Sequence, residues 1–143
     1  MFVNSTIRQT LHMSIGGPSI RIRISNAFGT SDLPITAVTV ALPFNGSAGV
    51  AAIQSNTLKT VTFSGSKNYT IPNGALIVSD PIDFKVEPQS MLTVTIYLAD
   101  GQRSATNAIT SHPGSRTISW MSAGNQVSAT NITDSSSANV AHW

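Results

Sequence analysis

Apolar and polar residues alternate along most of the chain, and no segment shows the 3.6-residue period of an amphipathic helix. Near the N-terminus, Ile7, Leu11 and Met13 share one face of an extended segment with Ile15. Successive side chains of a β-strand point to opposite faces, so this spacing predicts a strand with one buried face. The alternation recurs in later segments, with apolar residues at Ile20, Ile22 and Ile24; Val38, Val40 and Leu42; Val61 and Phe63; Ile82, Phe84 and Val86; and Leu92, Val94, Ile96 and Leu98.

The first two predicted strands flank Gly16 and Gly17. This pair suits a two-residue type I′ turn, because both central residues of that turn need positive φ. A hairpin closed there places apolar residues opposite apolar residues and polar opposite polar, so we expect the two strands to pair. The predicted register joins Met13 to Ile20, His12 to Arg21, Leu11 to Ile22 and Thr10 to Arg23.

Turn-forming sequences separate the later strands, among them PFNGSAG, IPNGA and VEPQS. About eight to ten short strands with such spacing predict an all-β fold, an antiparallel β-sandwich with jelly-roll-like connections. No linker or internal repeat is visible, so we expect a single β-sandwich domain over residues 1–143. From Ser122 onward the alternation weakens, and SATNITDSSSAN predicts a polar connection.

Composition narrows the classes of partner. Charged residues make up 10% of the chain, against about 25% in an average soluble protein. The formal net charge of +2 comes from 8 basic and 6 acidic residues, and no segment holds a basic cluster. We therefore expect no nucleic-acid partner, because neutralising several phosphates requires such a cluster. The chain has no cysteine, so it contains no disulfide.

The N-terminus lacks a basic start followed by an apolar stretch, and no run of apolar residues is long enough to cross a bilayer. We expect neither a signal peptide nor a membrane span in this chain. Four Asn-X-Ser/Thr sequons begin at Asn4, Asn45, Asn68 and Asn131. They suit an extracellular glycoprotein whose leader has been removed. Chance is the other explanation in a chain rich in Ser, Thr and Asn, and the protein is cytoplasmic if Met1 is its natural start.

Two arginines stand out because charges are scarce. Arg21 and Arg23 alternate with isoleucines, and the predicted hairpin places them beside His12 and Arg8 as a basic strip on an outer sheet surface. Either this strip is solvated or paired with Asp32, Asp80 or Asp83, or it is a surface on which a partner docks. The candidate partner surface comprises His12, Arg21, Arg23 and the terminal Trp143.

Motifs for catalysis are missing. The sequence contains neither Gly-X-Ser-X-Gly nor Gly-Asp-Ser, the motifs that place a nucleophilic serine on a sharp turn. The Ser-X-X-Lys spacing of SGSK lies in a Gly/Ser turn, whereas a serine–lysine nucleophile begins a helix. The three histidines are far apart and none has a second ligand at metal-site spacing. We predict no catalytic residue, no cofactor and no metal site.

Carbohydrate binding is more compatible with the composition. Small-ligand sites combine aromatic faces with a few placed polar groups, and the candidates here are Tyr97, Trp120, Tyr69 and Asp80. Tyr97 falls on the predicted outer face beside Thr93 and Thr95. Trp120 has the parity of Ile118, so it belongs either to the core or to a site. A glycan is therefore one expected partner, and self-association is another.

Six blocks occur in this order between Asn4 and Trp143: NSTIRQTLHMSIGG, IRIRISNAFGTSDLPITAVTVA, GALIVSDPIDFKV, LTVTIYL, ITSHPGSRTISW and AHW. They resemble the N-terminal β-domain that precedes the catalytic domain in fungal secreted GDSL-type esterases of the SGNH hydrolase superfamily. The resemblance implies a β-sandwich accessory domain of an extracellular acyl-ester hydrolase. The Gly-Asp-Ser and Asp-X-X-His blocks of that family are absent here, and GTSD has its Ser and Asp in the opposite order. No catalytic residue can be assigned from the family.

Two functional hypotheses follow. The first is a non-catalytic, lectin-like module that binds carbohydrate. The second is a structural accessory domain that supports or shields the active site of an SGNH hydrolase and binds no ligand alone. In the second case the basic strip, or the SNAFGT and SHPGSRT loops, would face the hydrolase domain.

Overall fold

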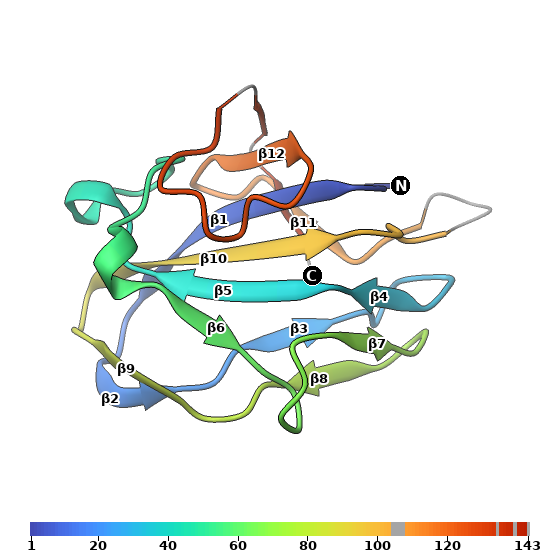
Figure 1. Cartoon of the computed structure of the whole chain (residues 1–143), viewed down its shortest axis with the longest axis horizontal. Helices are drawn as coiled ribbons and strands as arrows, with labels where there is room; N and C mark the ends of the chain where they lie inside the picture. Colours follow the sequence, from blue (N-terminus) through green and yellow to red (C-terminus); the bar gives the residue numbers. More distant parts are fainter. Residues whose placement is uncertain (104–107, 134, 139, 143) are drawn as a thin grey trace.

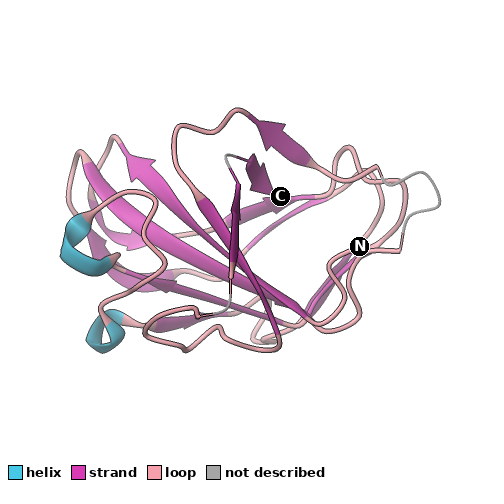
Figure 2. Ribbon diagram, turned by 90° about the horizontal axis from the view of Figure 1, so that it is seen from above, coloured by secondary structure: helices cyan, strands magenta, loops and turns pink. Residues whose placement is uncertain are grey.

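A computed structural model of the chain describes residues 1–103, 108–133, 135–138 and 140–142. It confirms the predicted all-β antiparallel sandwich. Two 3-10 helices, η1 (Phe44–Gly46) and η2 (Ser55–Thr57), lie at the same end of the molecule (Figure 2).

The largest sheet has six strands in the order β13-β12-β1-β10-β5-β6. Its strands are β13 (Ser136–Ala138), β12 (Ser119–Ala123), β1 (Ser5–Met13), β10 (Ser90–Leu98), β5 (Ala37–Ala41) and β6 (Lys59–Val61). The two longest strands, β1 and β10, pair antiparallel from Ser5 opposite Leu98 to Met13 opposite Ser90. In Figure 1, β1, β10 and β5 run alongside one another across the molecule.

Shorter antiparallel pairs form the opposing layer, most of which Figure 1 shows below β5. The pairs are β2 (Gly17–Ile20) with β9 (Ile82–Val86), β3 (Arg23–Ser25) with β8 (Leu76–Val78), and β4 (Leu33–Ile35) with β7 (Tyr69–Ile71). A further pair, β11 (Ser111–Pro113) with β14 (Val140–His142), lies near the C-terminus.

The core lies between these two layers. It combines Val38 and Val40 of β5 with alternate residues of β10, such as Val94, and with residues of β9, such as Phe84. The predicted period-two alternation of these strands is therefore confirmed. No buried residue of β1 or β12 belongs to this cluster. Of β1, Met13 packs against the cluster as a partly buried side chain.

The predicted Gly16–Gly17 hairpin is wrong. β1 pairs with β10 and β12, whereas β2 and β3 pair with β9 and β8 in the other layer. The positive φ angles of the described glycines occur elsewhere. Gly16 is instead needed for close packing, because a Cβ on it would lie 2.6 Å from Pro88 Cδ and 2.7 Å from the Val86 carbonyl oxygen. Local alternation determines which side chains face inward, but it does not determine the partner strand.

The outer face of the six-stranded sheet is covered by two irregular segments, residues 47–53 and 124–132. Backbone groups of these segments bond to polar side chains of the sheet: the Thr10 hydroxyl accepts from the Gly49 N–H at 2.7 Å, and the Thr39 hydroxyl donates to the Val127 carbonyl at 2.8 Å. The segment from Ser122 onward, in which SATNITDSSSAN predicted a polar connection, therefore contains part of a packed layer, and residues 136–138 form β13. The isolated apolar residues of the packed part, Val127 and Ile132, are buried.

Arg8 lies at the centre of this covered face with 0% of its surface exposed. Its Nε donates to Thr95 Oγ1 at 2.9 Å, Nη1 donates to the Ala51 carbonyl at 2.6 Å, and Nη2 donates to the Ala129 carbonyl at 2.8 Å. Burial lowers the pKa of the guanidinium from 12.5 to about 10, so it remains charged at neutral pH. Uncharged acceptors from both covering segments thus surround a buried cation.

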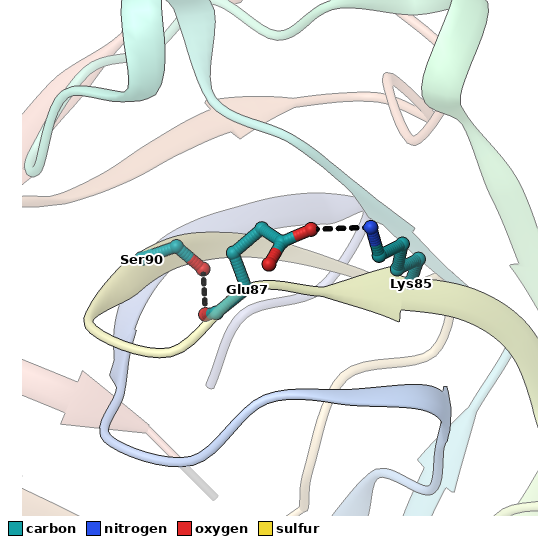
Figure 3. Close-up of polar contacts among 3 residues, drawn as sticks. All are labelled: Lys85, Glu87 and Ser90. Carbon is teal, nitrogen blue, oxygen red and sulfur yellow. Dashed lines mark hydrogen bonds and ion pairs between the residues drawn. The ribbon is translucent and has the colours of Figure 1, made fainter.

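The turn from β9 into β10 carries an exposed ion pair (Figure 3). Lys85 Nζ lies 2.6 Å from Glu87 Oε1, and the Ser90 hydroxyl donates to the Glu87 carbonyl at 2.6 Å. The Glu87 carboxylate raises the pKa of Lys85. Because both charged side chains are mostly exposed, the pair contributes little to stability.

Candidate functional site

An apolar cavity of about 320 Å³ lies between the inner face of β1 and β10 and strand β3. Leu11 of β1 and Val94 and Ile96 of β10 line one side, and Ile22 and Ile24 line the other. Its volume falls within the range of about 300–1,000 Å³ that is usual for ligand pockets. The cavity therefore borders the main core, to which Val94, Ile96, Ile22 and Ile24 belong.

Strand register explains why apolar residues meet here. Leu11 and Gln9 lie opposite Leu92 and Val94 in the β1–β10 pair, so their side chains share the inner face. Gln9 is buried, lines the cavity and accepts a long hydrogen bond of 3.4 Å from the Ser119 hydroxyl. A polar group therefore stands at one side of an otherwise apolar wall.

The rim of the cavity combines one exposed aromatic side chain with polar residues. Phe28 is 76% exposed, and its N–H donates to Thr110 Oγ1 at 3.0 Å. This bond joins the loop after β3 to the segment that leads into β11. Arg23 and His112, both exposed, also line the cavity. A cationic group, an imidazole and a large apolar ring thus surround its entrance.

The predicted basic strip is not formed. Arg8 is buried in the six-stranded sheet, whereas Arg21 and Arg23 are exposed in the opposing layer. His12 is exposed on β1, where it lies opposite Met91 rather than Arg21. The strip depended on the hairpin that the fold does not contain. Trp143, the fourth residue of the predicted partner surface, lies outside the described residues.

Arg21 is not in an ion pair at contact distance within the described chain. Its Nη1 donates to the Ser79 carbonyl at 3.2 Å. Its charge adds to the groups that lower the pKa of Asp80, the neighbour of Ser79. Arg21 therefore fits the expectation of a solvated arginine. Of the two arginines, only Arg23 lines the cavity.

Of the four residues predicted to bind sugar, Tyr97 and Trp120 lie on the covered face of the six-stranded sheet. Tyr97 is half-buried, and its hydroxyl donates to Asn4 Oδ1 at 2.9 Å. Trp120 is also half-buried, lies opposite Arg8, and donates from Nε1 to the Gly49 carbonyl at 2.9 Å. Both polar ends are thus bonded within the protein.

Asp80 closes the turn between β6 and β7. Its carboxylate accepts hydrogen bonds from the Gly65 N–H at 2.8 Å, the Thr62 hydroxyl at 2.7 Å and the Ser64 N–H at 3.0 Å. These donors, with Gly65 the largest contributor, lower the pKa of Asp80. The structure therefore gives Asp80 a turn-stabilising position.

Tyr69 lies apart from the other three, on β7, and is 41% exposed. Its ring is tilted against Phe63, with a centroid separation of 6.2 Å and an interplanar angle of 46°. The fold does not bring the four predicted residues together in one site. The asparagines of the four sequons, in contrast, are all exposed: Asn4, Asn45, Asn68 and Asn131.

Sequence reasoning missed the cavity and the buried Arg8. The loop motif SNAFGT placed Phe28 near a turn, but nothing local indicated that segment 110–112 would lie beside it. Among the described residues, no group of three or more His, Asp or Glu side chains is placed to hold a metal ion. The described part of the chain also contains no helix of the length and apolar character needed to cross a bilayer.

The sequence was compared with protein-family models and with curated proteins, and neither comparison found a match. The cavity between β1, β10 and β3 is therefore chosen as the candidate site from its geometry alone.

Proposed function

We propose that this chain is a non-catalytic accessory domain of a secreted SGNH-type acyl-ester hydrolase, and that it docks on the hydrolase domain through the cavity between β1, β10 and β3. The observation that carries the proposal is the apolar cavity of about 320 Å³ with the exposed Phe28 at its rim. Phe28 is large enough that burying it in an interface would contribute about 1.5–3 kcal/mol.

The cavity lies where several of the sequence blocks that carry the family resemblance come together. Arg23 and Phe28 belong to the block IRIRISNAFGTSDLPITAVTVA, and Thr110 to His112 belong to ITSHPGSRTISW. Gln9 and Leu11 belong to NSTIRQTLHMSIGG, and Val94 and Ile96 belong to LTVTIYL, so four of the six blocks meet at this cavity. This supports the choice of this surface as the one that faces the hydrolase domain, because the blocks are far apart in the sequence.

Such a domain would act by binding and shielding. An apolar surface that covers part of an active site excludes water, which strengthens electrostatic interactions inside it. The nucleophile and the base would belong to the hydrolase domain, since the sequence blocks that carry them are missing from this chain. The lectin-like function stays a prediction, and the dispersal of Tyr97, Trp120, Tyr69 and Asp80 favours docking over a site built from those four residues.

Docking is tested by mixing the chain with the separately expressed catalytic domain of a GDSL-type esterase whose own N-terminal domain carries the six blocks. Light scattering is expected to detect a one-to-one complex, and Phe28→Ser is expected to weaken it by about tenfold or more, since tenfold corresponds to 1.4 kcal/mol. Ile15→Ser is the matched control, because Ile15 is 80% exposed but does not line the cavity.

Absence of a complex with folded partners would contradict the proposal. Equal weakening by Phe28→Ser and Ile15→Ser would also contradict it, because the effect would then not belong to the cavity. Dimers of the chain alone, lost in Phe28→Ser, would assign the same surface to self-association instead.

A further inference from the structure

A second hollow lies at the end of the molecule formed by β4 and β7, which Figure 1 shows on the right. Its volume is about 360 Å³, and its lining includes Thr36, Asn68, Tyr69, Thr70 and Asp100. Unlike the cavity at β3, it has a mostly polar lining. This hollow is independent of the proposed docking surface, because the two share no lining residue.

An adjoining hollow of about 280 Å³ extends this surface. Pro34, Thr70 and Asp100 line both hollows, so the two are neighbours. The second hollow adds Asp32 and Arg103 to the polar groups. Together they form a groove, here called the Tyr69 groove, along the end of β4 and β7.

Tyr69 supplies a preorganised aromatic surface in this groove. Its ring packs against Phe63, which is buried, so one side of the tyrosine is held by the core. The residue as a whole is 41% exposed, so part of the side chain faces solvent. A side chain that is already ordered loses little conformational entropy when a ligand binds. Tyrosine offers an apolar face to such a ligand together with a polar hydroxyl.

Polar groups with spare hydrogen-bonding capacity surround the ring. One carboxylate oxygen of Asp32 accepts from the Asn73 N–H at 3.0 Å, and a carboxylate has about four acceptor positions in all. The Thr36 hydroxyl accepts from the Ala99 N–H at 2.9 Å and can still donate. Within the described chain, Arg103 is not at ion-pair distance from Asp32 or Asp100. Neither carboxylate is therefore in a direct ion pair with Arg103.

We propose that the Tyr69 groove binds a saccharide, with the Tyr69 ring beneath one face of a pyranose. The Asp100 carboxylate and the hydroxyls of Thr36 and Thr70 would hydrogen-bond to the sugar hydroxyls. A pyranose fits this lining because it presents an apolar C–H face and a rim of hydroxyls. Charge-assisted bonds to a carboxylate are stronger than bonds between neutral groups.

Two kinds of saccharide would present this chemistry to the groove: a glycan attached to the chain itself, or a separate glycan. Asn68, Tyr69 and Thr70 form one of the four sequons, and the exposed Asn68 lines the hollow. A glycan attached to Asn68 would therefore begin at the groove itself. The alternative source is a separate glycan that enters the groove of the unglycosylated chain.

The first arm of the test uses unglycosylated chain labelled with ¹⁵N and titrated with N,N′-diacetylchitobiose and with methyl α-mannoside. Binding is expected to shift the amide resonances of Tyr69, Thr70 and Asp100, and Tyr69→Ala is expected to weaken it by about tenfold. Phe44→Ala is the matched control, since Phe44 is an exposed aromatic residue that does not line the groove. Dispersed spectra of both variants establish that they are folded.

The second arm uses chain glycosylated at Asn68, compared with Asn68→Gln. If the attached glycan occupies the groove, its sugar protons shift through the ring current of Tyr69, and the shift disappears in Tyr69→Ala. Binding in the first arm assigns the groove to separate glycans, and a Tyr69-dependent shift in the second assigns it to the chain's own glycan. No response in either arm, or a response that Tyr69→Ala leaves unchanged, overturns the proposal.

Discussion

Gln102 Nε2 donates a hydrogen bond of 2.8 Å to Asn26 Oδ1, and both side chains are fully buried although 76 positions separate them in the sequence. Asn26 in turn donates from Nδ2 to the Ser31 carbonyl at 2.9 Å and to the Ile71 carbonyl at 3.2 Å. The pair thus joins the loop after β3, the end of β7 and the segment after β10. These buried hydrogen bonds constrain the three segments that they join, although Gln102 Oε1 has no partner among the described residues.

Gly29 is expected to be essential for this network. A Cβ at Gly29 would collide with Asn26 Oδ1 and would lie 2.7 Å from Gln102 Nε2. We expect Gly29→Ala to lower the free energy of unfolding by about 2–4 kcal/mol, because it displaces a buried hydrogen-bonded pair. Urea denaturation measures the change.

Gly17→Ala is the control for this substitution. The nearest atom to a Cβ at Gly17 is the Ser19 carbonyl oxygen at 3.6 Å, an ordinary contact distance. Its free energy of unfolding should stay within about 1 kcal/mol of the parent, or rise slightly because alanine restricts the unfolded chain. Equal losses in the two variants would show that the Asn26–Gln102 pair is not what constrains Gly29.

Arg8→Met is expected to destabilise the protein although it removes a buried charge. The substitution leaves the part-buried carbonyls of Ala51 and Ala129 without this donor, at a cost of about 1–3 kcal/mol each. Relief of the desolvation penalty offsets part of that cost, so we expect a net loss of about 3 kcal/mol by urea denaturation.

Arg21→Met is the matched control for Arg8, because Arg21 is exposed and, among the described residues, its guanidinium donates a single hydrogen bond, to the Ser79 carbonyl. An exposed substitution of this kind changes stability by about 0.5 kcal/mol or less. If Arg8→Met were as mild as Arg21→Met, the covering segments would be held by their apolar residues and not by the guanidinium.

The carboxylate of Asp80 makes the free energy of unfolding depend on pH in the acid range. The Gly65 N–H and the Thr62 hydroxyl, with smaller contributions from Ser64 and Arg21, lower the pKa of Asp80 below its usual 3.8. The unfolded chain therefore binds the proton more readily, and the stabilisation is present above pH 3.8 and is lost as pH falls through the native pKa. Asp80→Asn should be less stable than the parent at neutral pH.

The difference between Asp80→Asn and the parent should shrink when urea denaturation is repeated at pH values below the native pKa of Asp80. Asp83→Asn serves as the control, because Asp83 is exposed on β9. A constant difference between Asp80→Asn and the parent across the acid range would mean that the loss comes from packing of the amide and not from the charge.

Trp120→Phe should loosen residues 47–53 without unfolding the sheet. The substitution removes the bond from Nε1 to the Gly49 carbonyl, worth about 1 kcal/mol. Amide hydrogen exchange is expected to speed up at Gly49, whose N–H donates to Thr10 Oγ1, and to remain unchanged in β10. Equal acceleration in β10 would indicate global destabilisation. Saccharide binding at the Tyr69 groove should not change in this variant.

The fold class and the faces of the strands could be predicted from the sequence. Val94 and Ile96 were expected on an inward face and are buried, because a period of two in apolar residues follows directly from strand geometry. Arg8 could not be placed, because its burial depends on residues 47–53 and 124–132, which are distant in sequence and irregular in structure. Nothing local distinguishes a strand face covered by such segments from one that faces solvent.

The sequence by itself determined that this chain forms antiparallel strands with alternating inner and outer side chains, because that pattern is a property of each strand alone. Only the tertiary structure decided which strands pair, because Gly16 serves the close approach of Val86 and Pro88 rather than a hairpin. It also decided that Phe28 and His112 meet at one cavity, and that Tyr69 and Asp100 meet at another surface. Sites of this kind depend on contacts between segments far apart in the chain, and such contacts arise only when the two layers close on a common core.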